Sequence, residues 1–509
     1  MLRLRLWLAW LGLLAVVAGA SPALANGRFP RAQQLLEDPA EPAHLVLAAT
    51  YGLLVTEDRG RHWHYVCEAA YGEPDLTADA LLGLTEQGAL LAGIYSGVSR
   101  SLRSPCELKR TLGQNNREAV PDFAVVRAHP GQVVAIFTRL VPDGSFEHQL
   151  YRSQDDGVTW QAVGGLLPAV LRTPLTVDVA PSDENRVYLS GLDVDGEGVL
   201  LRSDDAGQTF ETLAIPVDAS SREAPYIAAI DGHSPDQLYV RTDVWAYDPS
   251  TGVAHAGDAL LYSDDGGASF SELMRASGKL FGFAFSPDAS ELLIGYGDPR
   301  EAGGLRVTER AALGIYRAAK GSAAFEQRYL GSVGCLTWTA EGLYACTHES
   351  DVGYSLGLIR DTEFDLAHAA ELEPLLALQD VAGPIDCDAC SVGATCRNYW
   401  QATCESWGRS DCEHLEAGEC SAAGAGGAGN AGESAVAGES AQAGAAGSDL
   451  VGSGATAAGN SERERGGCTC RWGQASARGA RPGSAAWLLS LFALGVLARR
   501  RSERLARPS

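Results

Sequence analysis

Two short stretches of the sequence contain side chains suited to catalysis or metal binding. Gly353, Ser355 and Gly357 have the G-x-S-x-G spacing of a serine nucleophile, which works only on a sharp turn between a strand and a helix. The surrounding sequence predicts short strands and loops, so an ordinary loop serine is the better interpretation. His62 and His64 could share one face of a strand and bind a metal there. They are more simply explained as exposed strand histidines.

Acidic side chains gather in two further stretches. Residues 193–197 alternate carboxylates as a calcium loop does, but the other ligands of an EF-hand are missing, so we expect an acidic loop between strands. Asp243, Trp245 and Asp248 lie in the longest predicted loop. Glycoside hydrolysis uses a pair of carboxylates, so these three residues are the first candidates for a site on that face.

One short pattern, S/T-x-D-x-G-x-x-W/F, occurs at 56–63, 153–160, 203–210 and 263–270. We call these four segments the repeat turns. Aspartate accepts backbone N–H bonds in tight turns, glycine supplies backbone freedom, and the aromatic residue begins the next strand and buries apolar surface. The pattern therefore predicts structural rather than catalytic roles for its members, which are Asp58, Gly60, Trp63, Asp155, Gly157, Trp160, Asp205, Gly207, Phe210, Asp265, Gly267 and Phe270.

The repeated pattern resembles the Asp box, or BNR repeat, of sialidases, sortilin-like receptors, xyloglucan hydrolases and photosystem assembly factors. The resemblance implies a β-propeller in which the box joins the third and fourth strands of each blade, away from the central site. The catalytic residues of the sialidases do not map onto this chain, since Arg28-Phe29-Pro30 does not match their F/Y-R-I-P motif. The xyloglucan hydrolases use a cleft between two propellers, and this chain has length for one.

The spacing of the repeat turns predicts the number of blades. Each turn follows short β-rich runs separated by Pro, Asp or Ser, as at 175–181 and 186–190. With the strand after the turn, each unit has four strands, as a propeller blade does. Degenerate copies near 101, 318 and 361 keep a period of about fifty residues. The prediction is an all-β, seven-bladed propeller over residues 40–375, or a six-bladed one if the last unit is only a closing strand.

The cysteines sort by region. Twelve cysteines in an exported chain should mostly form disulfides. Cys335 and Cys346 flank a short turn between predicted antiparallel strands and are expected to pair, while a bond between Cys67 and Cys106 would join neighbouring blades. Residues 384–420 predict a small module of three disulfides, with fifteen possible pairings that remain open, rather than a metal site. Its cysteines are Cys387, Cys390, Cys396, Cys404, Cys412 and Cys420.

The segments that flank these modules carry targeting signals. Residues 1–25 combine arginines, a short apolar run and an A-x-A pattern ending at Ala25, which predicts a secretory signal peptide rather than a membrane anchor. Residues 421–467 are rich in Ala, Gly and Ser and predict a disordered linker. A hydrophobic membrane helix is predicted at 485–498, directly before three arginines.

The tail at 468–509 combines Cys468, Cys470, the apolar segment and the terminal arginines. It resembles the C-terminal sorting tail of myxobacterial surface proteins, the MYXO-CTERM type. The resemblance implies that a membrane-embedded protease trims the tail and that the mature protein stays at the cell surface or outer membrane. One of the two cysteines would be the processing or lipid-attachment position. An uncleaved transmembrane anchor is the alternative.

The charge of the chain limits its partners. The net charge is −24, so the protein would repel phosphate backbones, and we expect no nucleic-acid partner. No motif calls for a cofactor, and we predict none. The sequence favours an exported, surface-anchored, non-catalytic module that binds a protein, peptide or glycan. A secreted glycoside hydrolase is the alternative.

Overall fold

The computed structural model describes residues 31–72, 80–94, 96–102, 104–113, 118–127, 129–219, 223–244, 257–298, 310–360, 372–416 and 418. Several predicted features lie outside this set: the signal peptide with Ala25, Trp245, Asp248, Cys420, the linker, and the tail with Cys468, Cys470 and the helix at 485–498. Within the described set, no helix combines the length and the apolar character needed to cross a membrane.

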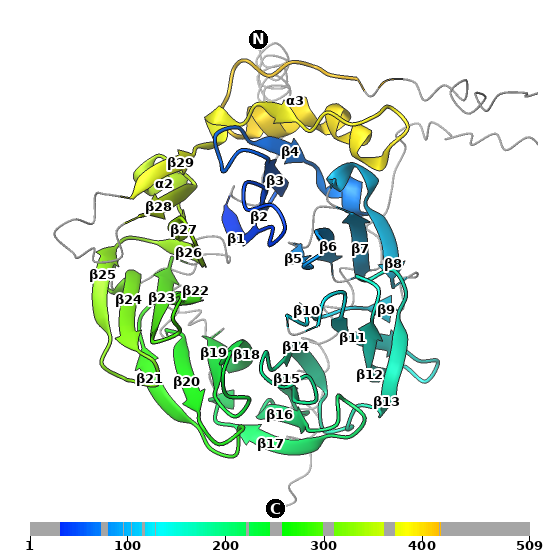
Figure 1. Cartoon of the computed structure of the whole chain (residues 1–509), viewed down its shortest axis with the longest axis vertical. Coiled ribbons are helices and arrows are strands. Elements are labelled where there is room, and N and C mark those ends of the chain that lie inside the picture. Colours follow the sequence, from blue (N-terminus) through cyan, green and yellow to red (C-terminus); the bar gives the residue numbers. More distant parts are fainter. Residues whose placement is uncertain are drawn as a thin grey trace, which may run out of the picture. The chain divides into compact units, whose positions relative to one another are not determined.

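Seven antiparallel sheets form a seven-bladed β-propeller, as the repeat spacing predicted (Figure 1). Blade 1 contains β1 (Ala32–Glu37), β2 (Leu45–Ala49), β3 (Gly52–Thr56) and β4 (His64–Val66). Blade 2 contains β5 (Leu81–Leu84), β6 (Ala89–Ile94), β7 (Gly97–Leu102) and β8 (Lys109–Leu112). Blade 3 contains β9 (Glu118–Ala119), β10 (Phe123–Val125), β11 (Val133–Leu140), β12 (Phe146–Ser153) and β13 (Gln161–Leu166).

Blades 4 to 7 have four strands each, taken in chain order. They are β14 (Thr173–Val179), β15 (Val187–Leu192), β16 (Gly198–Ser203) and β17 (Glu211–Ile215); β18 (Glu223–Ile230), β19 (Leu238–Val244), β20 (Ala259–Ser263) and β21 (Ser271–Arg275); β22 (Lys279–Phe285), β23 (Glu291–Gly297), β24 (Gly314–Ala319) and β25 (Glu326–Leu330); and β26 (Val333–Thr339), β27 (Gly342–Thr347), β28 (Leu356–Ile359) and β29 (Glu373–Leu376).

A further strand and several short helices complete the described fold. Strand β30 (Gly383–Pro384) follows blade 7. The helices are η1 (Glu68–Tyr71), η2 (Pro105–Glu107), η4 (Arg310–Ala312), α2 (Glu349–Val352), η6 (Leu378–Asp380), η7 (Val392–Thr395) and α3 (Cys396–Ser406).

The position of each strand within its blade decides its composition. Strands β2 and β6 are buried at every residue, because both faces of a blade pack against its neighbours. The outermost strand β13 is exposed at five of its six residues. Long apolar runs therefore mark the inner part of a blade, and mixed polar runs mark its rim.

Two glycines of the repeat turns also make the contacts between blades. Gly207 and Gly267 have φ of 90° and 88°, which glycine adopts without strain. A Cβ at Gly207 would lie 2.3 Å from Cδ2 of Leu150, and one at Gly267 would lie 2.2 Å from Cδ2 of Leu200. Leu150 lies on β12 and Leu200 on β16, the strand of the preceding blade that leads into its own repeat turn. Because the turn glycine has no side chain, a leucine of the neighbouring blade can pack against the turn at this position.

Side chains of one blade form hydrogen bonds with backbone groups on the innermost strand of the next blade. The amide of Gln34 in β1 bonds both to the N–H of Leu82 in β5, at 2.9 Å, and to its carbonyl, at 3.1 Å. The hydroxyl of Thr176 in β14 accepts the N–H of Ile227 in β18 at 2.9 Å. The hydroxyl of Thr337 in β26 donates to the carbonyl of Leu35 in β1 at 2.9 Å, which links the last blade to the first.

The segment after blade 7 holds the ring closed from outside. We call residues 383–412 the clasp. Its strand β30 pairs in parallel with β4 on the outer edge of blade 1, and α3 lies beside that blade in Figure 1. Cys396 of the clasp is bonded to Cys67, and Cys387 is bonded to Cys106 of η2 in blade 2. The clasp therefore joins the end of the propeller to its first two blades.

These bonds correct two predictions about the cysteines. Cys67 and Cys106 are not bonded to each other, because the clasp lies between them and supplies a partner for each. The C-terminal cysteines do not form a self-contained module of three disulfides, because two of them pair with the propeller. Cys404 and Cys412 are bonded within the clasp, and Cys390 is also in a disulfide. Cys335 and Cys346 are bonded to each other, as predicted.

Candidate functional site

The repeat turns use their polar atoms internally. In the turn at 203–210, the hydroxyl of Ser203 accepts the N–H of Gly207 at 2.8 Å and donates to Asp205 Oδ1 at 2.7 Å. The hydroxyl of Thr209 donates to Asp205 Oδ2 at 2.6 Å, and its N–H donates to Oδ1 at 2.8 Å. These bonds lower the pKa of Asp205 to about 2, and the bond from the Thr209 hydroxyl has the largest effect. The corresponding hydroxyls of the other turns are Thr56, Ser153 and Ser263.

The order of the strands separates the repeat turns from the other loops. Because the four strands of a blade are antiparallel, the connections between strands one and two and between strands three and four lie at one end of the ring. The connections between strands two and three and between successive blades lie at the other end, which we call the loop end. The repeat turns join strands three and four, so they lie opposite the loop end.

The candidate residues named from the sequence contact groups nearby in their own loops and turns. Ser355 is buried and its hydroxyl donates to Glu349 Oε2 at 2.7 Å, so it is not presented as a nucleophile. His62 is exposed, and its Nδ1 lies 2.5 Å from Oδ2 of the turn residue Asp58. In the hairpin at 193–197, the Oδ1 of Asp193 accepts the N–H groups of residues 195 and 197 at 2.8 and 2.9 Å. Backbone bonds thus occupy that carboxylate oxygen.

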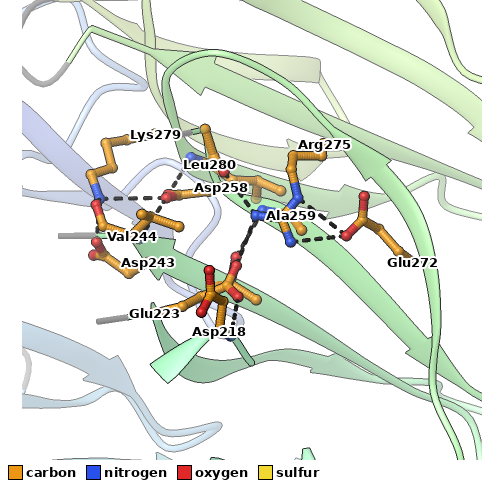
Figure 2. Close-up of polar contacts among 12 residues, drawn as sticks. Asp218, Glu223, Asp243, Val244, Asp258, Ala259, Glu272, Arg275, Lys279 and Leu280 are labelled. Atoms are coloured by element: carbon orange, nitrogen blue, oxygen red, sulfur yellow. Dashed lines mark hydrogen bonds and ion pairs between the residues drawn. The ribbon is translucent and has the colours of Figure 1, made fainter. Parts of the chain in front are cut away.

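The candidate site is a group of charged side chains at the loop end of blades 5 and 6 (Figure 2). Lys279 begins β22, and its Nζ donates to Asp243 Oδ1 and to the Val244 carbonyl, the latter at 2.7 Å. The same Nζ lies 3.4 Å from Asp258 Oδ1. The exposed fractions of the side chains are 8% for Lys279, 16% for Asp243 and none for Asp258, so this ion triad is almost dry.

Asp258 fixes the backbone around the triad. Its Oδ1 accepts the N–H of Val244 at 3.0 Å, and its Oδ2 accepts the N–H of Leu280 at 2.9 Å. Burial raises the pKa of Asp258 to about 6, although the positive charge of Lys279 opposes that rise. The carboxyl therefore connects the end of β19 with the start of β22, in the neighbouring blade.

A second ion pair lies beside the triad. Glu223 begins β18 and is buried; its Oε1 lies 2.9 Å from Nη1 of Arg275, and its Oε2 accepts the N–H of Asp218 at 2.8 Å. Arg275 ends β21 and is also bonded to Glu272 and to the carbonyl of residue 257. Figure 2 shows Arg275 between the two glutamates. Both groups of charges therefore lie beside residues 244 and 257, the described residues on either side of 245–256.

Two more carboxyls lie at the inner part of blades 3 and 4, one directly before β10 and one on β14. Asp122 lies between β9 and β10, and its Oδ2 accepts the N–H of Val177 at 2.8 Å. Burial, together with the charge of Asp178, raises the pKa of Asp122 to about 8. Burial also raises the pKa of Asp178 to about 6. Arg241, whose guanidinium lies 4.5 Å from the ring centre of Tyr226, lowers the pKa of Asp122.

One group of metal-ligating residue types occurs within the described ranges. It consists of Cys404, Asp411 and Cys412. The two sulfurs are bonded to each other, so they offer no thiolate to a metal.

Sequence reasoning found one member of these charged groups, Asp243, because it lies beside the longest loop. It missed Asp258, Lys279, Glu223 and Asp122, whose partners come from other strands or blades. The sequence signal that was available is the placement of charged residues at the two ends of the 245–256 segment.

Comparisons with known proteins identify no relative by sequence. No family model and no curated protein matches this chain. An ancestral GH74 enzyme is 13% identical, with a TM-score of 0.43 over 65% of this chain and 47% of its own length. The extracellular domain of a hybrid two-component system from B. thetaiotaomicron is 14% identical, with a TM-score of 0.42 over 65% of this chain and 38% of its own. YCF48 from Cyanidioschyzon merolae is 10% identical, with a TM-score of 0.34 over 53% and 94%. This chain thus spans less than half of the first two structures.

Proposed function

We propose that this chain is an exported β-propeller that binds a protein, peptide or glycan ligand without transforming it. The observation that carries the proposal is the state of the acidic side chains at the loop end. Asp243 and Asp258 are bound to Lys279, and Glu223 is bound to Arg275. A glycosidase needs one carboxyl as a proton donor and one as a nucleophile or base. Carboxylates paired with cations in this way are poorly suited to either role.

Export and surface attachment form part of the same proposal. Disulfides persist in oxidising compartments, and four disulfides are placed within the described residues. The signal peptide at 1–25 and the tail at 468–509 are predictions from the sequence, and they agree with that compartment. We propose that the repeated pattern marks an Asp-box propeller, that a membrane protease processes the tail, and that the linker holds the propeller away from the membrane.

A glycoside hydrolase is the second candidate, and Asp122 is the observation that favours it. The pKa of Asp122 is raised to about 8 by burial, so this carboxyl is largely protonated at neutral pH. A proton-donating carboxyl beside a second acid is the arrangement that hydrolysis of glycosides uses. Asp178 would be that second acid.

One experiment separates the two candidates. The exported, processed protein and its Asp122→Asn variant are applied to a glycan array and a protein array, and release of reducing ends is measured on the same glycans. A binding module retains its ligand without turnover, and Asp122→Asn leaves the binding unchanged. A hydrolase releases reducing ends, and the variant loses at least a hundredfold in rate. Absence of both binding and turnover would contradict the proposal.

A further inference from the structure

The Lys279 triad has the composition and geometry of a site for amide-bond formation. A buried amine, Lys279 Nζ, is in hydrogen-bond contact with the carboxyl of Asp243. A second carboxyl, Asp258, lies 3.4 Å from the same nitrogen and is inaccessible to solvent. The three groups come from the end of β19, the residue directly before β20 and the start of β22, and the strands hold them in place (Figure 2).

Condensation requires the amine and the acid in their neutral forms. Removing an ion pair from water costs several kcal/mol per ion unless attraction and hydrogen bonds compensate. Transfer of the proton from Lys279 to Asp243 gives an amine and a carboxylic acid, which need no counter-charge. The amine is then a nucleophile, as desolvated lysines are in other sites.

We propose that Lys279 and Asp243 condense to an intramolecular amide, with Asp258 as the proton-transferring group. Nζ attacks Cγ of Asp243 and forms the C–N bond. Asp258 accepts a proton from Nζ and donates it to the departing hydroxyl, so the C–O bond breaks and one water leaves. No oxidant or further reactant is required.

Two neighbouring contacts support this chemistry. The Val244 carbonyl accepts a bond from Nζ at 2.7 Å, which orients the amine. Nη1 of Arg241 lies 3.9 Å from Asp243 Oδ2, where its positive charge can stabilise the oxygen as the tetrahedral intermediate forms. Well-oriented intramolecular reactions reach effective molarities of about 10⁵–10⁸ M.

The product would be a covalent bond between blades 5 and 6. Strand β19 belongs to blade 5 and β22 to blade 6, so the amide would fasten adjacent blades at the loop end. It would also secure the end of β19, from which the 245–256 segment leaves. Unlike the disulfides, this bond would survive reducing conditions.

The experiment is mass spectrometry of the full chain after complete reduction of disulfides. The bond lowers the mass by one water, about 18 Da. Trypsin would then yield one species in which residues 242–275 and 276–300 are joined and cleavage after Lys279 is blocked. Fragmentation must place the bond at Asp243 and not at Asp258, which lies in the same tryptic peptide.

Three variants test the roles of the residues, with circular dichroism as the control for folding. Lys279→Arg abolishes the mass loss. Asp243→Asn forms the same amide with loss of ammonia, about 17 Da, because its amide nitrogen then departs. Asp258→Asn slows the reaction at least tenfold. A full-mass wild-type protein, a bond placed elsewhere, or an unaffected Asp258→Asn variant would each overturn the proposal.

Discussion

Removing the disulfide between Cys67 and Cys396 tests whether the clasp closes the ring. The perturbation is the double variant Cys67→Ser, Cys396→Ser, which leaves Cys106 and Cys387 bonded. The two clasp disulfides span 329 and 281 residues, so with the inner bond in place the outer one closes a path of only 48, their difference. The chain-entropy relation then gives a loss of about 4 kcal/mol in the free energy of unfolding.

The matched control is the disulfide between Cys335 and Cys346, which spans 11 residues inside blade 7. The same relation gives about 3 kcal/mol for its removal. Removing both clasp disulfides should cost about 10 kcal/mol, because the first bond restored to the doubly reduced chain closes a loop of 281 residues or more. That loss is of the order of the total stability of a domain.

The assay is urea denaturation without reductant, followed by tryptophan fluorescence. The expected order of loss is both clasp bonds, then the outer clasp bond, then the hairpin bond. The variant that lacks both should also show raised protease sensitivity in blades 1 and 2. If it unfolds at the same urea concentration as the hairpin variant, then packing between blades, and not the clasp, closes the ring.

Three further predictions concern single residues. Gly207→Ala should destabilise the protein by about 2–4 kcal/mol, since it adds overpacking against Leu150 to the cost of a left-handed backbone. Gly144→Ala is its control: φ is 85° and nothing lies within 4 Å of the added Cβ, so urea denaturation should show a loss of only about 1 kcal/mol. The pKa of Asp122 is raised, so the folded state binds its proton more tightly and the free energy of unfolding should fall as pH rises from 4 to 8. In urea denaturation, Asp122→Asn should show a smaller change of this free energy over the same pH range. An unchanged pH dependence would contradict the raised pKa. Asp205 has a lowered pKa, so its contribution is present above pH 4 and lost towards pH 2, and Asp205→Asn should reduce acid sensitivity in the same assay.

The sequence predicted the features of the fold that depend on neighbours along the chain. The turn at 203–210 closes through residues at most four apart, so its pattern is visible in any copy. Blade number followed from the spacing of such turns. The bond between Cys335 and Cys346 could be predicted because a single hairpin brings the two cysteines together.

The charged groups and the clasp could not be predicted in the same way. Lys279 and Asp243 are 36 residues apart and belong to different blades, and Cys67 and Cys396 are separated by 329 residues. Their proximity depends on how blades pack around the ring and on where α3 lies. A pattern in the linear sequence carries neither fact.

Every blade from the fourth to the seventh is one unbroken stretch of sequence, and the contacts between blades give this arrangement a consequence for inheritance. Blade 4 accepts Leu150 of blade 3 at Gly207 and presents Leu200 to Gly267 of blade 5. A gene segment that encodes one blade therefore encodes both the glycine that accepts a leucine of the preceding blade and the leucine that packs against the following blade. A duplicated blade of this kind would arrive already compatible with its neighbours, so the ring could grow by copying without new interfaces having to evolve.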